Sequence, residues 1–423
     1  MLEALHGYKW RHYAGFRRRS NVLGFAAGFL LGALALAPAA VASPPAKLTF
    51  TMARVGSPGN RAASVIPFKD AIFPSCSVAP TTPAGCLSVG SVGYPYDIGE
   101  LEVTVAQWVA FLNTVDPTGT DLHHLYNPLY ESAASWPRYG QINFSSRARP
   151  GLHYRVAYPE WADKPYGFAN FLRAARFVNS LTNGRVLSRR ATRAGGFSFV
   201  TYTVRLSRQT ERGMYDLARP RATRARKRGF VVPSQDEWIK AAYFDPRGGG
   251  TFSYWKYPTN PGVFFTGGMA DAPASTTLNP QTGDVTNAGT QPLANYKPSG
   301  GTAPYWCPSQ VSATDCQTVN PFGLDPAAYA ALYQGSLSTV GQARTRSPWG
   351  TLDQGGNAVE WTDTITPPPF GLPGPRIWRR LHGGVPNATA YQMWLSAVGL
   401  QPQDNVFFTN TYPWLGFRIG HIG

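Results

Sequence analysis

The alternation of hydrophobic and polar positions predicts strands in the first part of the chain. Residues 48–55 alternate apolar and polar side chains, and residues 94–101 are expected to form another strand. A period of two places every second side chain on one face of a strand, so one face should be buried. The stretches 262–295 and 300–341 lack such a period and are expected to be loops.

A first helix is predicted directly after Thr104. Gln107 stands three positions further on, so the two side chains can complete a capping box. Trp108, Phe111 and Leu112 then fall on one face of the helix, at the spacing of a buried stripe. We assign these aromatic residues to the core rather than to chemistry.

Two further helices follow the same logic. Residues 168–181 carry apolar side chains at helical spacing, and Gly184 lies just past the expected end. The third helix begins at Ser234, where Glu237 completes a second capping box, and it should end before Pro246.

The composition favours one loop-rich domain. The chain has 44 Gly and 37 Pro, which favour turns, and its 23 Phe, 21 Tyr and 12 Trp supply the apolar area that a loop-rich body needs. No linker divides residues 43–423, so we predict a single α+β domain with little regular secondary structure.

Residues 1–42 have the pattern of a secretory signal peptide. A basic start precedes an apolar stretch, and Ala40-Val41-Ala42 offers a cleavage site. The alternative is an uncleaved anchor helix. We expect a periplasmic or secreted protein without a membrane span after signal cleavage.

The net charge of +16 is concentrated in the segment from Arg185 to Arg228. A basic surface attracts polyanions. Nucleic acid is not expected as the partner of an exported protein, whereas acidic polysaccharide, lipopolysaccharide or anionic lipid headgroups are. The alternative, which the sequence favours, is a solvated and mobile basic loop.

The four cysteines form two close pairs, Cys76 with Cys86 and Cys307 with Cys316. Export to an oxidising compartment predicts two local disulfides. A thiol or metal site is the alternative, but neither pair has the CxxC spacing.

Five short motifs follow one another along the chain. They are Glu102-Val103-Thr104 with Gln107-Trp108 and Phe111, Pro233-Ser234-Gln235-Asp236-Glu237-Trp238, Asp353 to Trp361, His382-Gly383-Gly384 and Gly416-Phe417-Arg418. Their order and spacing resemble the formylglycine-generating enzyme family, also called the sulfatase-modifying-factor family. The resemblance runs from about residue 98 to residue 419. It implies the fold of that family, which is distantly like C-type lectins.

A structural calcium site is predicted around the double glycine of the third motif. Carboxylates and backbone carbonyl groups in a tight turn suit a hard cation. The resemblance implies the side chains of Asp353 and Glu360 and the carbonyl groups of Gly356 and Ala358 as ligands. It also implies a second site with Asn295 and the carbonyl of Tyr296. The alternative is a glycine turn in which Glu360 pairs with an arginine.

The family's oxidation of a substrate cysteine uses copper held by two cysteines. The resemblance places them at Ala388 and Met393, and no cysteine follows Cys316. Because copper(I) needs soft thiolate ligands, copper and the family reaction are not expected.

The segment 385–414 corresponds to the family's pocket. Aromatic residues among Asn and Gln suit binding of a glycan or a peptide. We therefore expect an exported binding or scaffold module without oxidase activity. The alternatives are an oxidoreductase of the same family with different site chemistry and a polyanion-binding surface protein. The candidate pocket residues are His382, Ala388, Met393, Trp394 and Trp414, with Tyr391, Phe407, Phe408 and Tyr412 nearby.

Overall fold

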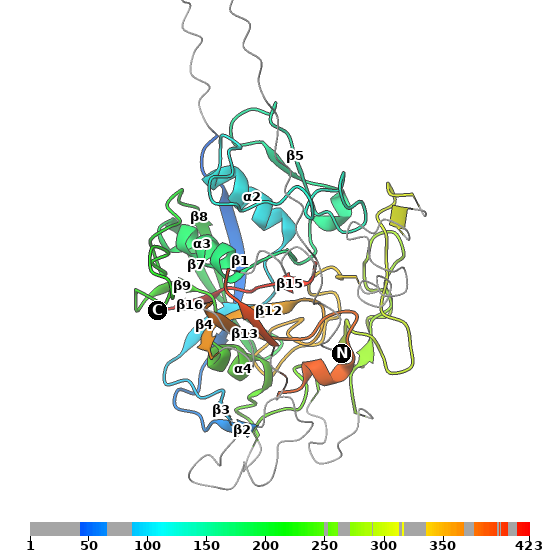
Figure 1. Cartoon of the computed structure of the whole chain (residues 1–423). Helices are drawn as coiled ribbons and strands as arrows, with labels where there is room; N and C mark the ends of the chain where they lie inside the picture. Colours follow the sequence, from blue (N-terminus) through cyan, green and yellow to red (C-terminus); the bar gives the residue numbers. More distant parts are fainter. Residues whose placement is uncertain are drawn as a thin grey trace, which may run out of the picture. The chain divides into compact units, whose positions relative to one another are not determined.

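The computed structural model describes most of the chain from Ser43 onwards (Figure 1). The predicted signal segment, Cys76, Cys86, Phe407, Phe408 and Tyr412 lie outside the described residues. All described residues belong to one compact unit, Val41–Gly423. None of the described helices is long and apolar enough to cross a membrane. The described residues are 43–65, 87–248, 253–260, 271–289, 291–312, 315–316, 336–367, 376–395, 397, 399–404 and 413–423.

A six-stranded sheet with the order β7-β8-β1-β4-β16-β9 forms the centre of this unit. The two strands predicted from the sequence, at 48–55 and 94–101, are its antiparallel neighbours β1 and β4. The last strand of the chain, β16, pairs with both β4 and β9, so β9 forms the edge of the sheet opposite β7. The strands are β1 (Lys47–Val55), β4 (Tyr96–Gly99), β7 (Arg185–Ala194), β8 (Phe197–Arg205), β9 (Gly229–Val231) and β16 (Gly420–Ile422).

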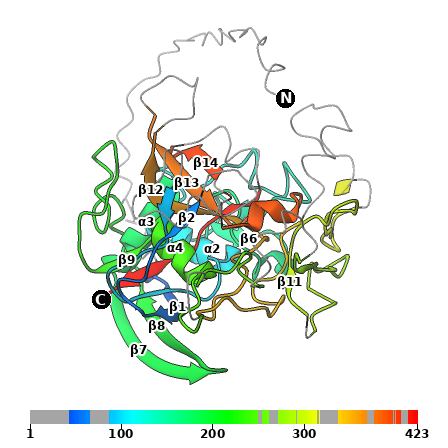
Figure 2. The ribbon, with the colours of Figure 1, turned by 90° about the horizontal axis from the view of Figure 1, so that it is seen from below.

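The interpretation of the basic segment as a mobile loop is wrong for its first half. Strands β7 and β8 form a long antiparallel hairpin at the edge of the sheet (Figure 2). Gly195 and Gly196 both have positive φ, 58° and 83°, which suits a two-residue hairpin turn. The apolar residues of β8 alternate toward the core at Val200, Tyr202 and Val204, and that pairing fixes β7 beside them.

The three predicted helices are present. Helix α2 (Val105–Val115) and helix α4 (Gln235–Tyr243) begin after Thr104 and Ser234, and both capping boxes are formed as predicted. Helix α3 (Phe171–Thr182) begins three residues later than the prediction, because the side chain of Asn170 caps it by accepting from the backbone N–H of Arg173.

The main core lies between helices α2 and α3 and one face of the large sheet. Phe50 of β1, Trp108 of α2 and Phe177 of α3 meet there, and the Trp108 ring stacks on Tyr166 at 4.2 Å. Helix α4 contributes Ala241 to a separate cluster with residues from the other face of the sheet. Both faces of the sheet are therefore packed.

A second sheet, with the order β14-β13-β12-β15, carries two of the predicted site residues, Glu360 on β12 and His382 on β13. Three two-stranded ladders and two short 3-10 helices complete the described elements. The pair β10 and β11 lies inside the stretch 262–295 that was expected to be loop. The remaining elements are β2 (Ala63–Val65), β3 (Leu87–Val89), β5 (Ile142–Phe144), β6 (Tyr154–Val156), η1 (Pro159–Trp161), β10 (Ala274–Ser275), β11 (Leu293–Ala294), β12 (Val359–Thr366), β13 (Trp378–His382), η2 (Ala390–Met393), β14 (Gly399–Pro402) and β15 (Leu415–Gly416).

Candidate functional site

Glu360, the second carboxylate of the predicted calcium loop, lies on β12 with its side chain fully buried. Arg418 donates to both of its carboxylate oxygens, at 2.6 and 2.7 Å, and Trp238 donates its indole N–H to one of them at 2.8 Å. Glu360 is thus paired with an arginine, as the alternative interpretation of the loop expects. Both of its carboxylate oxygens already accept hydrogen bonds.

In the turn before β12, the backbone passes close to Asn295. Asp353, Gly356 and Asn357 all have positive φ, at 58°, 80° and 60°. A Cβ atom on Gly356 would lie 2.4 Å from the carbonyl oxygen of Asn295, so only glycine fits beside that strand. The backbone N–H of Asn357 donates to the same carbonyl at 2.9 Å. The loop of the first predicted calcium site therefore contacts Asn295, a residue of the second predicted site.

The oxygens of Asn295 and Tyr296 already accept hydrogen bonds. Thr276 lies 3.1 Å from the side-chain oxygen of Asn295, and Ser275 donates to the Tyr296 carbonyl at 2.6 Å. Asp353 accepts from the backbone N–H of Gly341. Burial raises the pKa of Asp353 to about 6, because the charged form loses its hydration.

Glu102 is a third buried carboxylate in this region, and sequence reasoning gave it no role beyond its motif. One of its oxygens accepts from the side-chain amide of Asn357 at 3.1 Å. Its other oxygen is buried without a hydrogen-bond partner among the described residues. Burial, with the negative charge of Asp353 second, raises the pKa of Glu102 well above its usual value.

The fit of calcium to this cluster depends on Glu102 and Asp353 rather than on Glu360. All three carboxylates are buried, but Arg418 donates to Glu360 alone among them, and an unpartnered buried oxygen such as that of Glu102 is costly. In the described part of the chain, no three His, Cys, Asp or Glu side chains are arranged to hold a metal ion. Since calcium also takes carbonyl oxygens, a site here would combine the two carboxylates with backbone groups. Calcium stays a prediction.

The predicted pocket segment surrounds a hollow of about 460 Å³ beside the second sheet. Ala388 and Trp414 line it, together with Tyr391, whose side chain is 50% exposed. We call this space the ligand hollow. Its polar lining groups, apart from the tyrosine, are Asn387, Thr389, Gln392 and Gln401.

The other predicted pocket residues, His382, Met393 and Trp394, do not line the ligand hollow. Met393 and Trp394 belong to a small core cluster, in which the Trp394 indole N–H donates to the Tyr257 hydroxyl at 2.8 Å. The ring of His382 stacks on Trp238 at 5.2 Å. Burial, followed by the charge of Arg380, lowers the pKa of His382 to about 3, so the imidazole is neutral at physiological pH.

The predicted disulfide between Cys307 and Cys316 is present, with a Cα–Cα distance of 6.1 Å. Both cysteines belong to the stretch 300–341, and neither stands at the position of Ala388 or Met393 in the sequence. A disulfide sulfur cannot act as a copper thiolate without prior reduction. The described residues therefore offer no thiolate at the positions of the family's copper ligands.

No protein-family model matches the chain, and no curated protein matches it. Solved structures similar to it include Treponema denticola variable protein 1, with 16% identity and a TM-score of 0.39 over 90% of this chain and 100% of that chain. CarF is similar at 12% identity and a TM-score of 0.35, over 90% and 99%. PvdO from Pseudomonas aeruginosa is similar at 12% identity and a TM-score of 0.37, over 90% and 100%. Likeness at this level indicates neither fold nor function, so the site is interpreted from its own residues.

Proposed function

We propose that this protein is an exported binding module of the formylglycine-generating enzyme family and that its ligand hollow takes a neutral glycan. The ordered motifs support the family, and the sheet-rich α+β architecture with few helices is compatible with it. The lining of the ligand hollow supports the ligand class. The partly exposed Tyr391 offers a face for a sugar ring, and the lining includes three amide side chains, a group that both donates and accepts hydrogen bonds.

The observation that carries the proposal is that the described residues of this lining include no charged group. Among the described residues that line the ligand hollow, no histidine, cysteine, carboxylate, lysine or arginine occurs. General acid–base catalysis relies mostly on such groups, and copper binding uses cysteine or histidine. A neutral polar ligand needs only aromatic, hydroxyl and amide groups, so binding is favoured over the oxidoreductase alternative.

The test is a binding screen with a matched pair of tyrosine variants. Purified protein is titrated with neutral tetrasaccharides of glucose, galactose or N-acetylglucosamine. Tyr391→Ala should weaken the best complex about tenfold, because a stacked ring contributes on the order of 1–2 kcal/mol. Tyr305→Ala, which changes a 39% exposed tyrosine outside the lining, should leave the affinity unchanged. Binding of no saccharide, or equal binding by both variants, contradicts the proposal.

A second assay separates binding from the family reaction. The protein is incubated with a Cys-x-Pro-x-Arg peptide, with and without copper. Ala388 and Met393 stand at the positions of the family's cysteines, so the peptide should keep its mass. A mass loss that corresponds to conversion of cysteine to the aldehyde would favour the oxidoreductase alternative.

A further inference from the structure

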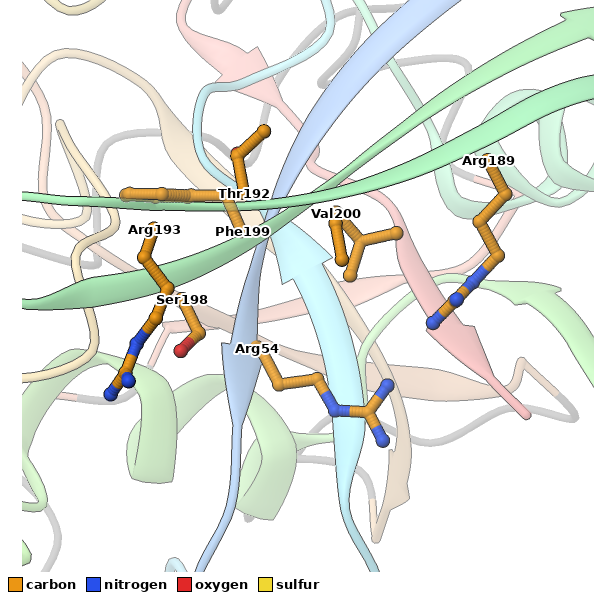
Figure 3. Close-up of a pocket in the computed structure, with 8 residues that line it drawn as sticks. Arg54, Arg189, Thr192, Arg193, Ser198, Phe199 and Val200 are labelled. Carbon is orange, nitrogen blue, oxygen red and sulfur yellow. The ribbon is translucent and has the colours of Figure 1, made fainter.

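We propose that the β7–β8 hairpin carries a second binding site, in which Arg54, Arg189 and Arg193 hold an acidic polysaccharide. The three side chains surround a hollow of about 390 Å³, which we call the arginine hollow (Figure 3). It is lined from the large sheet, whereas the ligand hollow is lined mainly from the second sheet and the loop after β13. Failure of either proposal therefore leaves the other standing.

Strand register places the three arginines on one face of the sheet. Arg189 pairs with Tyr202 and Arg193 pairs with Ser198, while Ala191 lies opposite Val200 between them. Paired residues share a face in an antiparallel ladder. The floor of the hollow thus consists of small or apolar residues, and the guanidinium groups stand around it. Figure 3 shows Arg189 and Arg193 extending from β7 to the same side as Arg54.

Arg54 reaches the same face from the neighbouring strand β1. It follows Leu48, Phe50 and Met52 at every second position, and these three are buried under the helices. Arg54 lies where that cover ends, and its side chain is 42% exposed. The face that forms the main core therefore continues as an open, basic surface.

The guanidinium groups keep most of their donors available. Within the described chain, Arg54 donates to Asp97 at 3.2 Å and Arg189 donates to the Tyr202 hydroxyl at 3.2 Å. Arg193 is exposed. Each guanidinium has five N–H donors in a planar fork that fits phosphate, sulfate or carboxylate groups. The only acidic side chain in contact with these arginines in the described residues is the buried Asp97.

The two arginines that β7 contributes to the hollow differ from some other basic residues in the segment 185–228, whose charges are paired with nearby carboxylates. Arg224 points into the protein, where it pairs with Glu237 at 2.6 Å and with Asp363 at 2.5 Å. Arg219 pairs with Asp216 at the surface. The arginines of the basic segment therefore lie in different environments. Those on β7 belong to a strand that is exposed at every position.

A polymer fits this surface better than a membrane does. Peripheral membrane binding combines cations with apolar side chains that insert into the lipid. In the described chain, none of the exposed large hydrophobic residues lines the arginine hollow. Val186 and Leu187 are exposed on β7, but they lie outside the lining. Repeated anionic groups on a sugar chain could contact successive arginines along the hairpin.

The test uses two double variants of β7 that remove equal charge from opposite faces. Arg189→Gln with Arg193→Gln removes two of the three guanidinium groups of the hollow. Arg185→Gln with Arg190→Gln instead changes the opposite face of the hairpin, which also carries Thr201 and Arg205. Binding to dextran sulfate is measured at about 0.15 M salt, with neutral dextran as the blank. The first variant should bind at least about tenfold more weakly, because charge-assisted hydrogen bonds are lost. The second should stay within about threefold of the wild type.

Equal losses in the two variants would overturn the proposal, since general charge would then explain binding. Wild-type affinity in the first variant would overturn it as well. The third arm uses vesicles of phosphatidylglycerol. Tighter binding to these vesicles than to dextran sulfate, lost in the first variant only, would assign the site to a membrane surface instead.

Discussion

Arg418 and Glu360, 58 positions apart in the sequence, form an ion pair in which both side chains are fully buried and the closest N–O distance is 2.6 Å. Arg418 also donates to the backbone carbonyl groups of Gly99, Glu100 and Leu352. All five guanidinium N–H groups are thus used. The pair links the end of the chain to the glycine loop and to the strand region before helix α2.

Removing Arg418 should destabilise the protein strongly. Arg418→Met leaves the Glu360 carboxylate buried without its partner, and breaking such a pair costs about 3–5 kcal/mol. Denaturant unfolding would measure the loss. Arg247→Ala removes a pair with Asp245 in which Arg247 is 66% exposed, and it should cost about 0.5 kcal/mol or less. A loss for Arg418→Met as small as that of the control would contradict the assigned role.

Chelation should lower the melting temperature if calcium occupies the carboxylate cluster. A ligand that binds only the folded state adds about 2.7 kcal/mol at a hundredfold excess over its dissociation constant. Glu102→Gln should reduce the response to chelator, because it removes one of the two carboxylates that calcium would need. Glu211→Gln, at a carboxylate with 42% exposure, is the control. No chelator effect on the wild type would exclude calcium.

Acid should destabilise the protein through His382. Its folded-state pKa is lowered to about 3, whereas the unfolded imidazole titrates near 6.5. The unfolded state therefore binds the extra proton as the pH falls from 6.5 toward 3, and stability is lost across that window. At pH 5 this amounts to about 2 kcal/mol.

Comparison of pH series for two variants isolates this contribution. His382→Leu should flatten the fall in unfolding free energy between pH 6.5 and 4. His124→Asn, at an exposed position with positive φ that asparagine tolerates, should keep the wild-type slope. The same slope in all three proteins would show that His382 does not titrate as its burial requires.

Local signals in the sequence predicted the helices well. Thr104 with Gln107 and Ser234 with Glu237 are contacts between neighbours in the chain, so their spacing alone specifies the caps. The start of α3 was missed because its apolar stripe begins before the capping residue Asn170. The alternation of Val200, Tyr202 and Val204 after Gly195-Gly196 would have revealed the hairpin, but the many arginines favoured a loop.

The candidate sites depend on contacts that no local pattern contains. The sequence around Glu360 favoured a calcium loop over an ion pair, and only the return of the chain near residue 418 brings Arg418 to this carboxylate. Arg54 joins Arg189 because β1 and β7 both flank β8, across more than a hundred residues of sequence. The resemblance placed Ala388 and Trp414 in one pocket segment, but it could not separate them from Met393 and Trp394, which do not line the hollow.

The affinity of an Ala388→Trp variant for the best neutral tetrasaccharide tests the central claim most directly. Ala388 lines the ligand hollow and is partly exposed, so a tryptophan there can fill the space without replacing a core residue. Ala388→Ser, which keeps the space, is the matched control. We predict a loss of about tenfold or more for Ala388→Trp, with an unchanged melting temperature, and near wild-type affinity for Ala388→Ser. Wild-type affinity in Ala388→Trp would show that the ligand does not occupy the hollow.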